Sequence, residues 1–153
     1  MIFSLNYTTR WHDTDANRQV RPSALVTYLQ ETANEHLIHA AISLDELRDR
    51  YGLAFLLSNI SVRIYEPLFS GDAIEVQTWI CEGRGFRHNR CFRLLRDGKT
   101  VAEATSVGVD KLARESAGGR VRFVTDSPYV AVAVEYAAEH LGGIRGSILV
   151  IVI

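Results

Sequence analysis

Three polar side chains stand at alternate positions near the start of the chain, just ahead of a long segment with helical periodicity. They are Asp13, Asp15 and Asn17, within the stretch RWHDTDANRQVRPS at residues 10–23. Carboxylates in such a place can act as a general base or a nucleophile, and an amide can orient water or a carbonyl group. Short acceptor side chains are also common in turns and at helix N-termini, where they bind backbone amides. Both interpretations are open for Asp13 and Asp15.

The same D-x-D-x-N spacing begins a calcium loop of the EF-hand type. That loop needs Gly at its sixth position and a bidentate Glu at its twelfth, and the chain has Arg18 and Ala24 there. No second cluster of His, Cys or Asp with ligand spacing stands near His12 and Asp13. We therefore expect no metal and no other cofactor.

The composition is that of one globular domain. The 153 residues are 47% hydrophobic and 23% charged, with a formal net charge of −1. A near-neutral chain argues against nucleic acid as the main partner, because phosphate binding needs a basic excess. The sequence shows neither a signal peptide nor an apolar run of about 18 residues. We expect a soluble, cytoplasmic protein without a membrane partner.

The chain has two cysteines, Cys81 and Cys91. Two cysteines in a cytoplasmic chain do not indicate a disulfide scaffold. Neither has a His beside it in sequence, so both are predicted to be inert thiols of the core.

The longest predicted helix is opened by Pro22 and Ser23. From Ala24 to Ala41, apolar positions recur at steps of three and four residues and give one buried face: Leu25, Tyr28, Leu29, Thr32, Ala33, His36, Leu37 and Ala40. His36 lies within this face and is predicted to be a satisfied buried histidine. Ser43 followed by Glu46 predicts a capping box and a short second helix, which Gly52 ends.

Five segments are rich in β-branched and aromatic residues and are predicted to be strands: 2–11, 53–67, 73–82, 86–96 and 99–112. LFSGD at 68–72 and the pair Asp97-Gly98 are hairpin signals, so consecutive strands are expected to pair antiparallel. A sheet with one apolar helix must bury that helix against one of its faces. The sequence therefore predicts an α+β hot-dog fold, with a long central helix wrapped by a curved antiparallel sheet.

The end of the chain is less regular. Residues 127–141 (SPYVAVAVEYAAEHL) fit a helix begun by Ser127 and Pro128, although the Val-Ala alternation also permits a strand; we favour the helix. The final SILVIVI must be buried, paired across an interface, or the remnant of a longer chain. We expect a hot-dog domain over 1–125 and a C-terminal helix and apolar tail over 126–153, packed on the domain or the interface.

Arginines recur at every third residue through the predicted strand 86–96 and just before it, at Arg84, Arg87, Arg90, Arg93 and Arg96. A period of three scatters side chains over both faces of a strand, so a single basic patch is not expected. Most of these side chains are predicted to be solvated or paired with acids. The functional alternative is that some bind the phosphates of coenzyme A or an acidic carrier protein.

Several stretches resemble, in the right order, the acyl-acyl-carrier-protein thioesterases, and within them the first of two tandem hot-dog repeats. They are NYTTRW, YLQETANEH, LLSNISVRIYEP, GDAIEVQTWI, DGKTVAEATSVGV and KLAR. The resemblance covers about residues 5–115. Because this chain holds about one repeat, the resemblance implies self-association into a homodimer or a dimer of dimers.

The loop is similar to the catalytic stretch of the second repeat and to the D-x-D loop of single-repeat acyl-coenzyme A thioesterases. Asp15, Asn17 and Gln19 fall where those enzymes place Asp, Asn and His, and Glu31 falls where they often carry a carboxylate. Gln19 cannot exchange protons near neutral pH, so it can only orient or donate a hydrogen bond. Asp15 is then the candidate base or nucleophile.

The first turn of the predicted helix can complete such a site. Its unpaired amides and positive dipole end can hold the oxyanion that forms during thioester hydrolysis. Pro22 removes one donor, so the remaining amides of the turn carry this role.

We therefore expect a thioesterase of fatty acid biosynthesis, acting on an acyl thioester of carrier protein or coenzyme A. The predicted catalytic residues are Asp15, Asn17, Gln19 and Glu31. The alternative is a non-catalytic acyl-binding or pairing module, which Gln19 and the likeness to a first repeat favour. A third possibility is an incomplete chain that lacks a second repeat.

Overall fold

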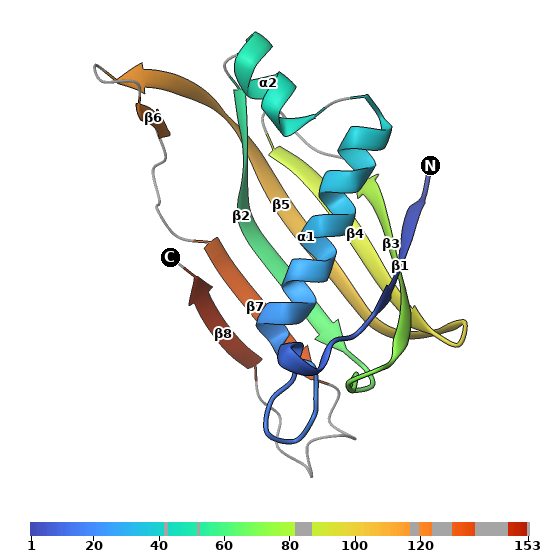
Figure 1. The fold of residues 1–153 in the computed structure, drawn as a ribbon. Helices are drawn as coiled ribbons and strands as arrows, with labels where there is room; N and C mark the ends of the chain where they lie inside the picture. Colours follow the sequence, from blue (N-terminus) through green and yellow to red (C-terminus); the bar gives the residue numbers. More distant parts are fainter. Residues whose placement is uncertain are drawn as a thin grey trace.

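The computed structural model describes residues 1–41, 43–51, 53–81, 87–116, 120–123, 130–136 and 147–152. The helical elements are η1 (Trp11–Asp13), α1 (Pro22–His39) and α2 (Leu44–Tyr51). The strands are β1 (Phe3–Thr8), β2 (Leu53–Ile64), β3 (Ala73–Cys81), β4 (Arg87–Arg96), β5 (Lys99–Ser116), β6 (Arg120–Phe123), β7 (Val130–Tyr136) and β8 (Ser147–Val152). Helix α1 lies across one face of a curved, open sheet, as Figure 1 shows. The predicted α+β architecture is confirmed.

Helix α1 begins where the sequence predicts. Pro22 stands at its first position, where the missing N–H costs nothing and the fixed φ suits a helix. The predicted stripe is confirmed over most of its length, because the buried residues of α1 are Ala24, Leu25, Tyr28, Leu29, Thr32 and His36. Of the other predicted members, Ala33 and Leu37 are half-buried and Ala40 is exposed at the C-cap. The helix is followed by Ala40 as its C-cap and by Ala41, whose φ of 59° turns the chain out of helical geometry.

The core fills the space between α1 and the inner face of the sheet. Alternate residues of β2, β3 and β4 point to this face, because side chains along a strand alternate between its two sides. The fully buried members of the core include Leu29 from the helix and Ile60, Val76 and Leu94 from the strands, all with 0% exposure. The helix and the sheet therefore stabilise each other through one shared apolar layer.

The strand order in the sheet is β1-β3-β4-β5-β2-β7-β8, and β6 pairs with β5 outside this path. The predicted hairpins β3–β4 and β4–β5 are confirmed. Asp97 and Gly98 turn between β4 and β5 with φ values of 53° and 74°, as a two-residue hairpin loop of this kind requires.

The expectation that β2 pairs with β3 is wrong. Strand β2 lies beside β5, and β3 lies between β1 and β4. The segment LFSGD does form a tight turn, with Gly71 at a φ of 88°. Its backbone instead pairs with the loop ahead of α1, since the amide of Val20 donates to the carbonyl of Leu68 at 2.8 Å. The turn signal was correct, but turn residues do not determine which strands become neighbours.

The prediction of a helix over 127–141 is wrong for residues 130–136, the part that the structure describes. Residues Val130–Tyr136 form strand β7, which pairs parallel with β2 and antiparallel with β8. The Val-Ala alternation therefore belongs to a strand, and the edge of β2 gives it hydrogen-bond partners. Residues 127–129 and 137–141 lie outside the described part of the chain. The division of the chain near residue 125 stays a prediction, although β7 and β8 extend the same sheet.

The short helix α2 begins as its capping residue predicts. The amide of Glu46 donates to Ser43 Oγ at 3.0 Å, which is half of a capping box. Gly52, its predicted stop, lies outside the described residues. None of the helices in the described part of the chain is long and apolar enough to cross a membrane.

Cys81 and Cys91 are joined in a disulfide, so the prediction of free core thiols is wrong. In the β3–β4 register, Cys91 lies opposite Trp79 and Cys81 lies opposite Asn89. The cysteines are thus diagonal neighbours on adjacent strands, and their Cα atoms are 6.3 Å apart, within the range that a disulfide spans. The hairpin was predicted, but its register could not be read from the sequence.

Candidate functional site

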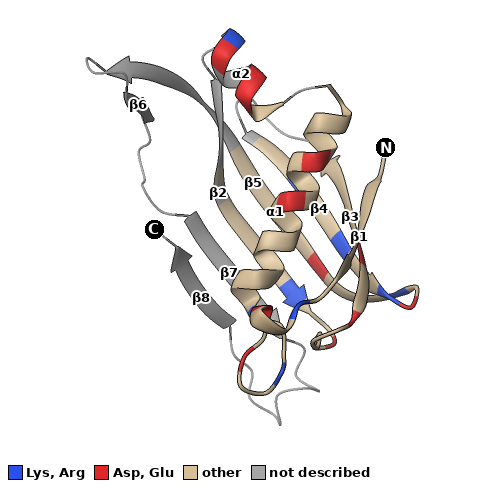
Figure 2. Cartoon of the chain, viewed as in Figure 1, with Lys and Arg blue, Asp and Glu red and all other residues tan. Residues whose placement is uncertain are grey.

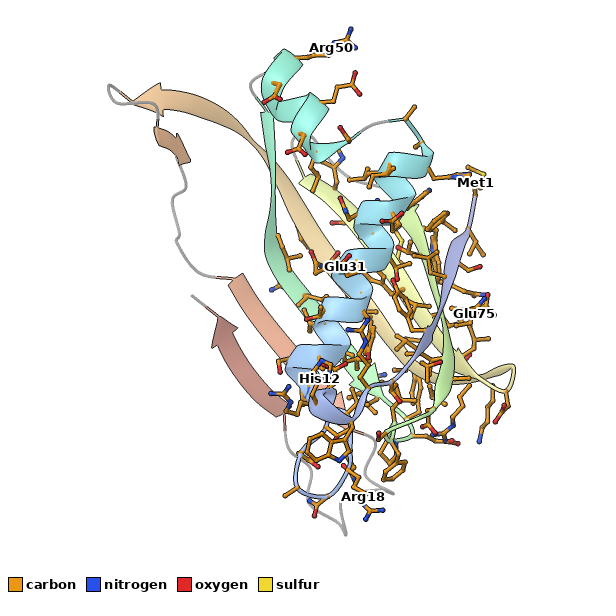
Figure 3. The ribbon with its side chains drawn as sticks, in the orientation of Figure 1. Met1, His12, Arg18, Glu31, Arg50 and Glu75 are labelled. Carbon is orange, nitrogen blue, oxygen red and sulfur yellow. A yellow bond between two sulfur atoms is a disulfide. The ribbon has the colours of Figure 1, made fainter. Side chains whose placement is uncertain are left out.

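The loop between η1 and α1 is a small hairpin of its own. Thr14 pairs with Val20, and the amide of Asp15 donates to the carbonyl of Gln19 at 2.8 Å. The amide of Arg18 donates to the carbonyl of Asp15 at 3.0 Å, and Arg18 has a left-handed φ of 63°. This is a three-residue hairpin loop that ends in a left-handed residue. It presents the side chains of its tip at one end of α1 (Figure 3).

Asp15 organises this loop with its own side chain. Its Oδ1 accepts the amide of Asn17 at 2.8 Å and the amide of Gln19 at 3.1 Å. The residue is exposed, and no described residue hydrogen-bonds its Oδ2. One carboxylate oxygen is therefore fixed by the backbone while the other faces solvent. Asp15 therefore acts as a turn residue and not as a helix cap, and this role is compatible with the chemical interpretation because the two use different oxygens.

Asn17 and Gln19 lie on the same loop but in different surroundings. The Asn17 side chain is exposed. Gln19 is half-buried and pairs with Phe69 in an isolated bridge. It lines a cavity of about 10 Å³ together with Glu66, Leu68 and other residues, which is room for about one water molecule.

Glu31 does not join the loop within one chain. It is exposed on the side of α1 that is turned away from the sheet, where Figure 3 labels it. It stands nine residues beyond Pro22, which corresponds to about 14 Å along the helix axis. Of the four predicted site residues, three thus lie on one loop, and Glu31 lies apart from it.

Asp13 and Tyr28 form a contact that the sequence analysis missed. Tyr28 Oη donates to Asp13 Oδ2 at 2.7 Å, and Asp13 Oδ1 lies 3.4 Å from His12 Nε2. Burial, and then the hydrogen bond to Asp13, raise the pKa of Tyr28 to about 12, so its hydroxyl stays protonated and donates. The available signal was a tyrosine in the buried stripe, which needs a partner for its hydroxyl. Asp13 is thus a structural contact between loop and helix.

A second set of contacts holds the other side of the loop. The amide of Ser70 donates to the carbonyl of Arg18 at 3.3 Å. The turn at 66–72 is itself fixed by Arg96, which binds Asp72 at 2.8 Å and Glu66 at 2.9 Å. Lys99 also pairs with Glu66. The loop is therefore held between helix α1 and an ion-paired turn.

The N-terminus of α1 lies directly after this loop. Arg21 is the N-cap residue and makes no side-chain cap hydrogen bond, and its Nη2 donates to the carbonyl of His12 at 2.9 Å. Pro22 has no N–H, so the first available helix amides are those of Ser23 and Ala24. The helix start thus offers donors and a positive dipole end beside the Asp15 loop. Figure 2 shows charges of both signs in this loop.

The arginines of the predicted period fall on different faces, as expected. Arg90 is buried beneath α1, whereas Arg93 lies on the other face with its guanidinium carbon 5.6 Å from the centre of the Trp79 ring. Arg96 takes part in the ion pairs described above. Arg84 lies outside the described residues, and the side chain of Arg87 is not described either. The predicted scatter over both faces is confirmed for Arg90 and Arg93, and the predicted pairing with acids is confirmed for Arg96.

A long helix on the concave face of an open sheet with the central order β1-β3-β4-β5-β2 defines a protein of the hot-dog class. Residues 1–115 match the family model described as the acyl-ACP thioesterase N-terminal domain. The chain belongs to this family, as the resemblance predicted.

Curated relatives lie in the same family. The chain is 27% identical over 152 residues to the chloroplastic palmitoyl-acyl carrier protein thioesterase of Arabidopsis thaliana, covering 86% of this chain and 36% of the relative. It is 26% identical over 117 residues to the protein of the same name from Cuphea hookeriana, covering 71% of this chain and 28% of the relative. The chain thus spans about a third of the length of these relatives.

Solved structures share the fold. An acyl-ACP thioesterase from Bacteroides thetaiotaomicron aligns with a TM-score of 0.69 and 20% identity, covering 83% of this chain and 54% of that one. A 1,4-dihydroxy-2-naphthoyl-CoA thioesterase from Synechocystis aligns with a TM-score of 0.69 and 17% identity, covering 82% of this chain and 90% of that one. The fold of this chain is therefore shared with a structure of which it covers about half and with one of which it covers nearly all.

Proposed function

We propose that this protein hydrolyses acyl thioesters at the loop between η1 and α1. The observation that carries the proposal is the Asp15 carboxylate, which two backbone amides orient beside an uncapped helix N-terminus. A thioesterase needs an activated water or a carboxylate nucleophile, together with donors for an oxyanion. The loop and the first turn of α1 supply both kinds of group. Family membership supports the same reaction.

In the reaction as we propose it, the free Oδ2 of Asp15 takes a proton from water while the water oxygen attacks the thioester carbonyl. The amides of Ser23 and Ala24 hold the resulting oxyanion. The carbon–sulfur bond then breaks, and Asp15 returns its proton to the leaving sulfur, which gives a carboxylic acid, a thiol and the regenerated carboxylate. Asn17 and Gln19 orient the water or the thioester. Direct attack by Asp15 to give an acyl anhydride, which water then hydrolyses, uses the same groups.

The participation of Glu31 requires a second subunit. Within one chain Glu31 and the loop are separated along α1, so only a neighbouring protomer can bring a Glu31 carboxylate to this loop. We propose a homodimer or a dimer of dimers that reproduces the tandem repeats of the longer relatives. Light scattering on the eluted peak from gel filtration tests this; a well-folded monomer with full activity would remove both the dimer and the role of Glu31.

The substrate we propose is an acyl group on carrier protein or coenzyme A, in fatty acid biosynthesis in the cytoplasm. The names of the curated relatives support carrier protein, and those of some structural neighbours support coenzyme A. The test is thiol release from a panel of short to long acyl thioesters on both carriers. Turnover on one carrier alone decides between them.

A non-catalytic acyl-binding or pairing module is the second candidate. It is favoured by Gln19 at the position where the resemblance implies a histidine, and by the match to an N-terminal domain. This module predicts saturable binding of an acyl thioester without thiol release. A single experiment that measures binding and release in parallel separates the two functions.

A further inference from the structure

Arg90 is a buried cation at the boundary between the helix and the sheet. It lies on β4 with 7% of its surface exposed and points to the inner face. Its Nη1 lies 2.9 Å from His36 Nδ1 on α1 and donates to Thr78 Oγ1 on β3 at 3.2 Å. Three elements therefore meet around one guanidinium group.

Both of these partners are neutral. Arginine can only donate, so Nδ1 of His36 must accept, and the imidazole then carries its proton on Nε2. Burial, and next the charge of Arg90, lower the pKa of His36, which agrees with a neutral ring. The described residues offer acceptors to Nη1 alone, and no carboxylate among them pairs with Arg90.

The other described arginines of β4 are paired differently. Arg96 binds two carboxylates, and Nε of Arg93 lies 3.6 Å from Glu103 Oε1. Both side chains are more exposed than that of Arg90, although Nε of Arg93 is itself buried and makes no hydrogen bond to a described residue. Arg90 is thus the most buried of these three arginines, and it is also the one whose described partners carry no negative charge. Burying a cation without an anion is costly, and among the described residues no carboxylate offsets this cost for Arg90.

The surroundings of Arg90 allow a ligand to approach. Ile80 lies directly opposite Arg90 in the β3–β4 register, so both side chains point to the same face, and Ile80 is 60% exposed. The Phe3 ring stacks against the His36 ring, with centroids 5.1 Å apart. Solvent therefore reaches the position next to Arg90, and aromatic rings border the site.

We propose that Arg90 binds an oxyanion of a ligand, carboxylate or phosphate, at the helix–sheet boundary. Nη2 and Nε of Arg90 meet no hydrogen-bond acceptor among the described residues, and a planar guanidinium can present two N–H groups to the two oxygens of such an anion. His36 and Thr78 hold Nη1 in place and so orient the other N–H groups of the guanidinium. This proposal rests on the proposed function only for the identity of the ligand. If the protein is a thioesterase, the oxyanion is either a terminal carboxylate on the acyl group or the phosphate of the acyl carrier.

Binding to the full chain tests the site without any need for turnover. Titration calorimetry is performed with inorganic phosphate, phosphopantetheine, octanoate and the eight-carbon dicarboxylate, using wild type, Arg90→Met, Arg90→Lys and the control Arg93→Met, whose side chain lies on the other face. We expect the probe that binds wild type to bind Arg90→Met on the order of tenfold to a hundredfold more weakly. Arg90→Lys retains part of the affinity and Arg93→Met retains all of it.

Two results overturn the proposal: no oxyanion binds wild type, or Arg90→Met binds as wild type does. Arg90→Met is expected to fold, since it removes a buried charge, and circular dichroism checks this. If Arg90→Met fails to fold, the comparison of wild type with Arg90→Lys decides: weaker binding by Arg90→Lys supports the site, and equal binding overturns it. Preference for the dicarboxylate over octanoate assigns the site to the acyl end, and preference for phosphopantetheine assigns it to the carrier.

Hydrolysis assays keep this proposal separate from the proposed function. Octanoyl thioester is compared with its terminal-carboxylate counterpart in wild type and Arg90→Met. Arg90-dependent binding without turnover of any thioester leaves the oxyanion site standing and removes the thioesterase. Turnover of a thioester with no Arg90-dependent binding leaves the thioesterase standing and removes the oxyanion site.

Discussion

Tyr28 and Asp13 join the helix to the loop through one hydrogen bond of 2.7 Å between Oη and Oδ2. Tyr28 is 8% exposed and also contacts the ring of Tyr7, with centroids 5.1 Å apart. The bond therefore fixes the start of the loop to a rigid part of the core. The position of Asp15, two residues further on, depends on it.

Replacing Tyr28 by Phe tests this connection. The change removes one hydrogen bond to a carboxylate, so we expect the free energy of unfolding to fall by about 1.5–3 kcal/mol in urea titrations. Turnover should fall as well, because Asp15 is held less firmly. Tyr7→Phe is the matched control, since it removes the neutral bond to Thr32 and should cost only about 1 kcal/mol. Equal losses in the two variants would contradict the special role of Tyr28.

The pH dependence of stability should report His36. Its pKa in the folded protein lies below the ordinary value of 6.5, so the unfolded chain binds a proton more readily. Stability is complete above pH 6.5 and falls as the pH drops toward the lowered pKa of the folded state. Thermal melts from pH 8 to pH 5 measure this, and His36→Gln should have a flatter profile. Identical slopes for both proteins would show that His36 does not contribute.

Arg18 is held in a left-handed conformation that suits glycine better than any residue with a Cβ. We expect Arg18→Gly to leave the stability unchanged or raise it by up to about 1 kcal/mol, and to preserve activity. Arg18→Val should lower the stability by about 1–2 kcal/mol, because a β-branched side chain tolerates this region poorly. Chemical denaturation compares the two, and a more stable Val variant would mean that the loop has another shape.

The disulfide between Cys81 and Cys91 closes a loop with a sequence separation of 10 residues. Chain-entropy arguments give such a link about 2–3 kcal/mol of stability. We expect the Cys81→Ser, Cys91→Ser double variant, or wild type in a thiol reductant, to unfold at correspondingly lower urea. Thiol counting on protein trapped directly from cells shows whether the bond forms there. Two free thiols would support a reducing cytoplasm, where disulfides rarely persist.

Local patterns in the sequence predicted the helix and the strands well. The three- and four-residue steps after Pro22 gave the buried face of α1, and Asp97-Gly98 gave the β4–β5 turn. Two errors have a common cause: the neighbours of β2 and the strand β7 depend on pairing between distant segments. Hydrophobic periodicity within one segment carries no information about such partners.

The loop was predicted in composition and in place, but its contacts were not. The sequence placed Asp15, Asn17 and Gln19 together, and the structure does so through the backbone amides bound to Asp15 Oδ1. The bond from Tyr28 to Asp13 and the burial of Arg90 against His36 and Thr78 depend on how the helix lies on the sheet. Neither distance follows from spacing along the chain.

Thiol release by wild type, Asp15→Asn and Asp13→Asn, measured side by side on the acyl thioester panel, tests the central claim most directly. Asn at position 15 can still accept the two loop amides at Oδ1, so the loop keeps its shape while the base or nucleophile is lost. We expect turnover by Asp15→Asn to fall by a factor of about 100 or more, and Asp13→Asn to lose much less. Full turnover in Asp15→Asn, or no turnover in folded wild type on any thioester, would contradict the assignment of this loop as the active site.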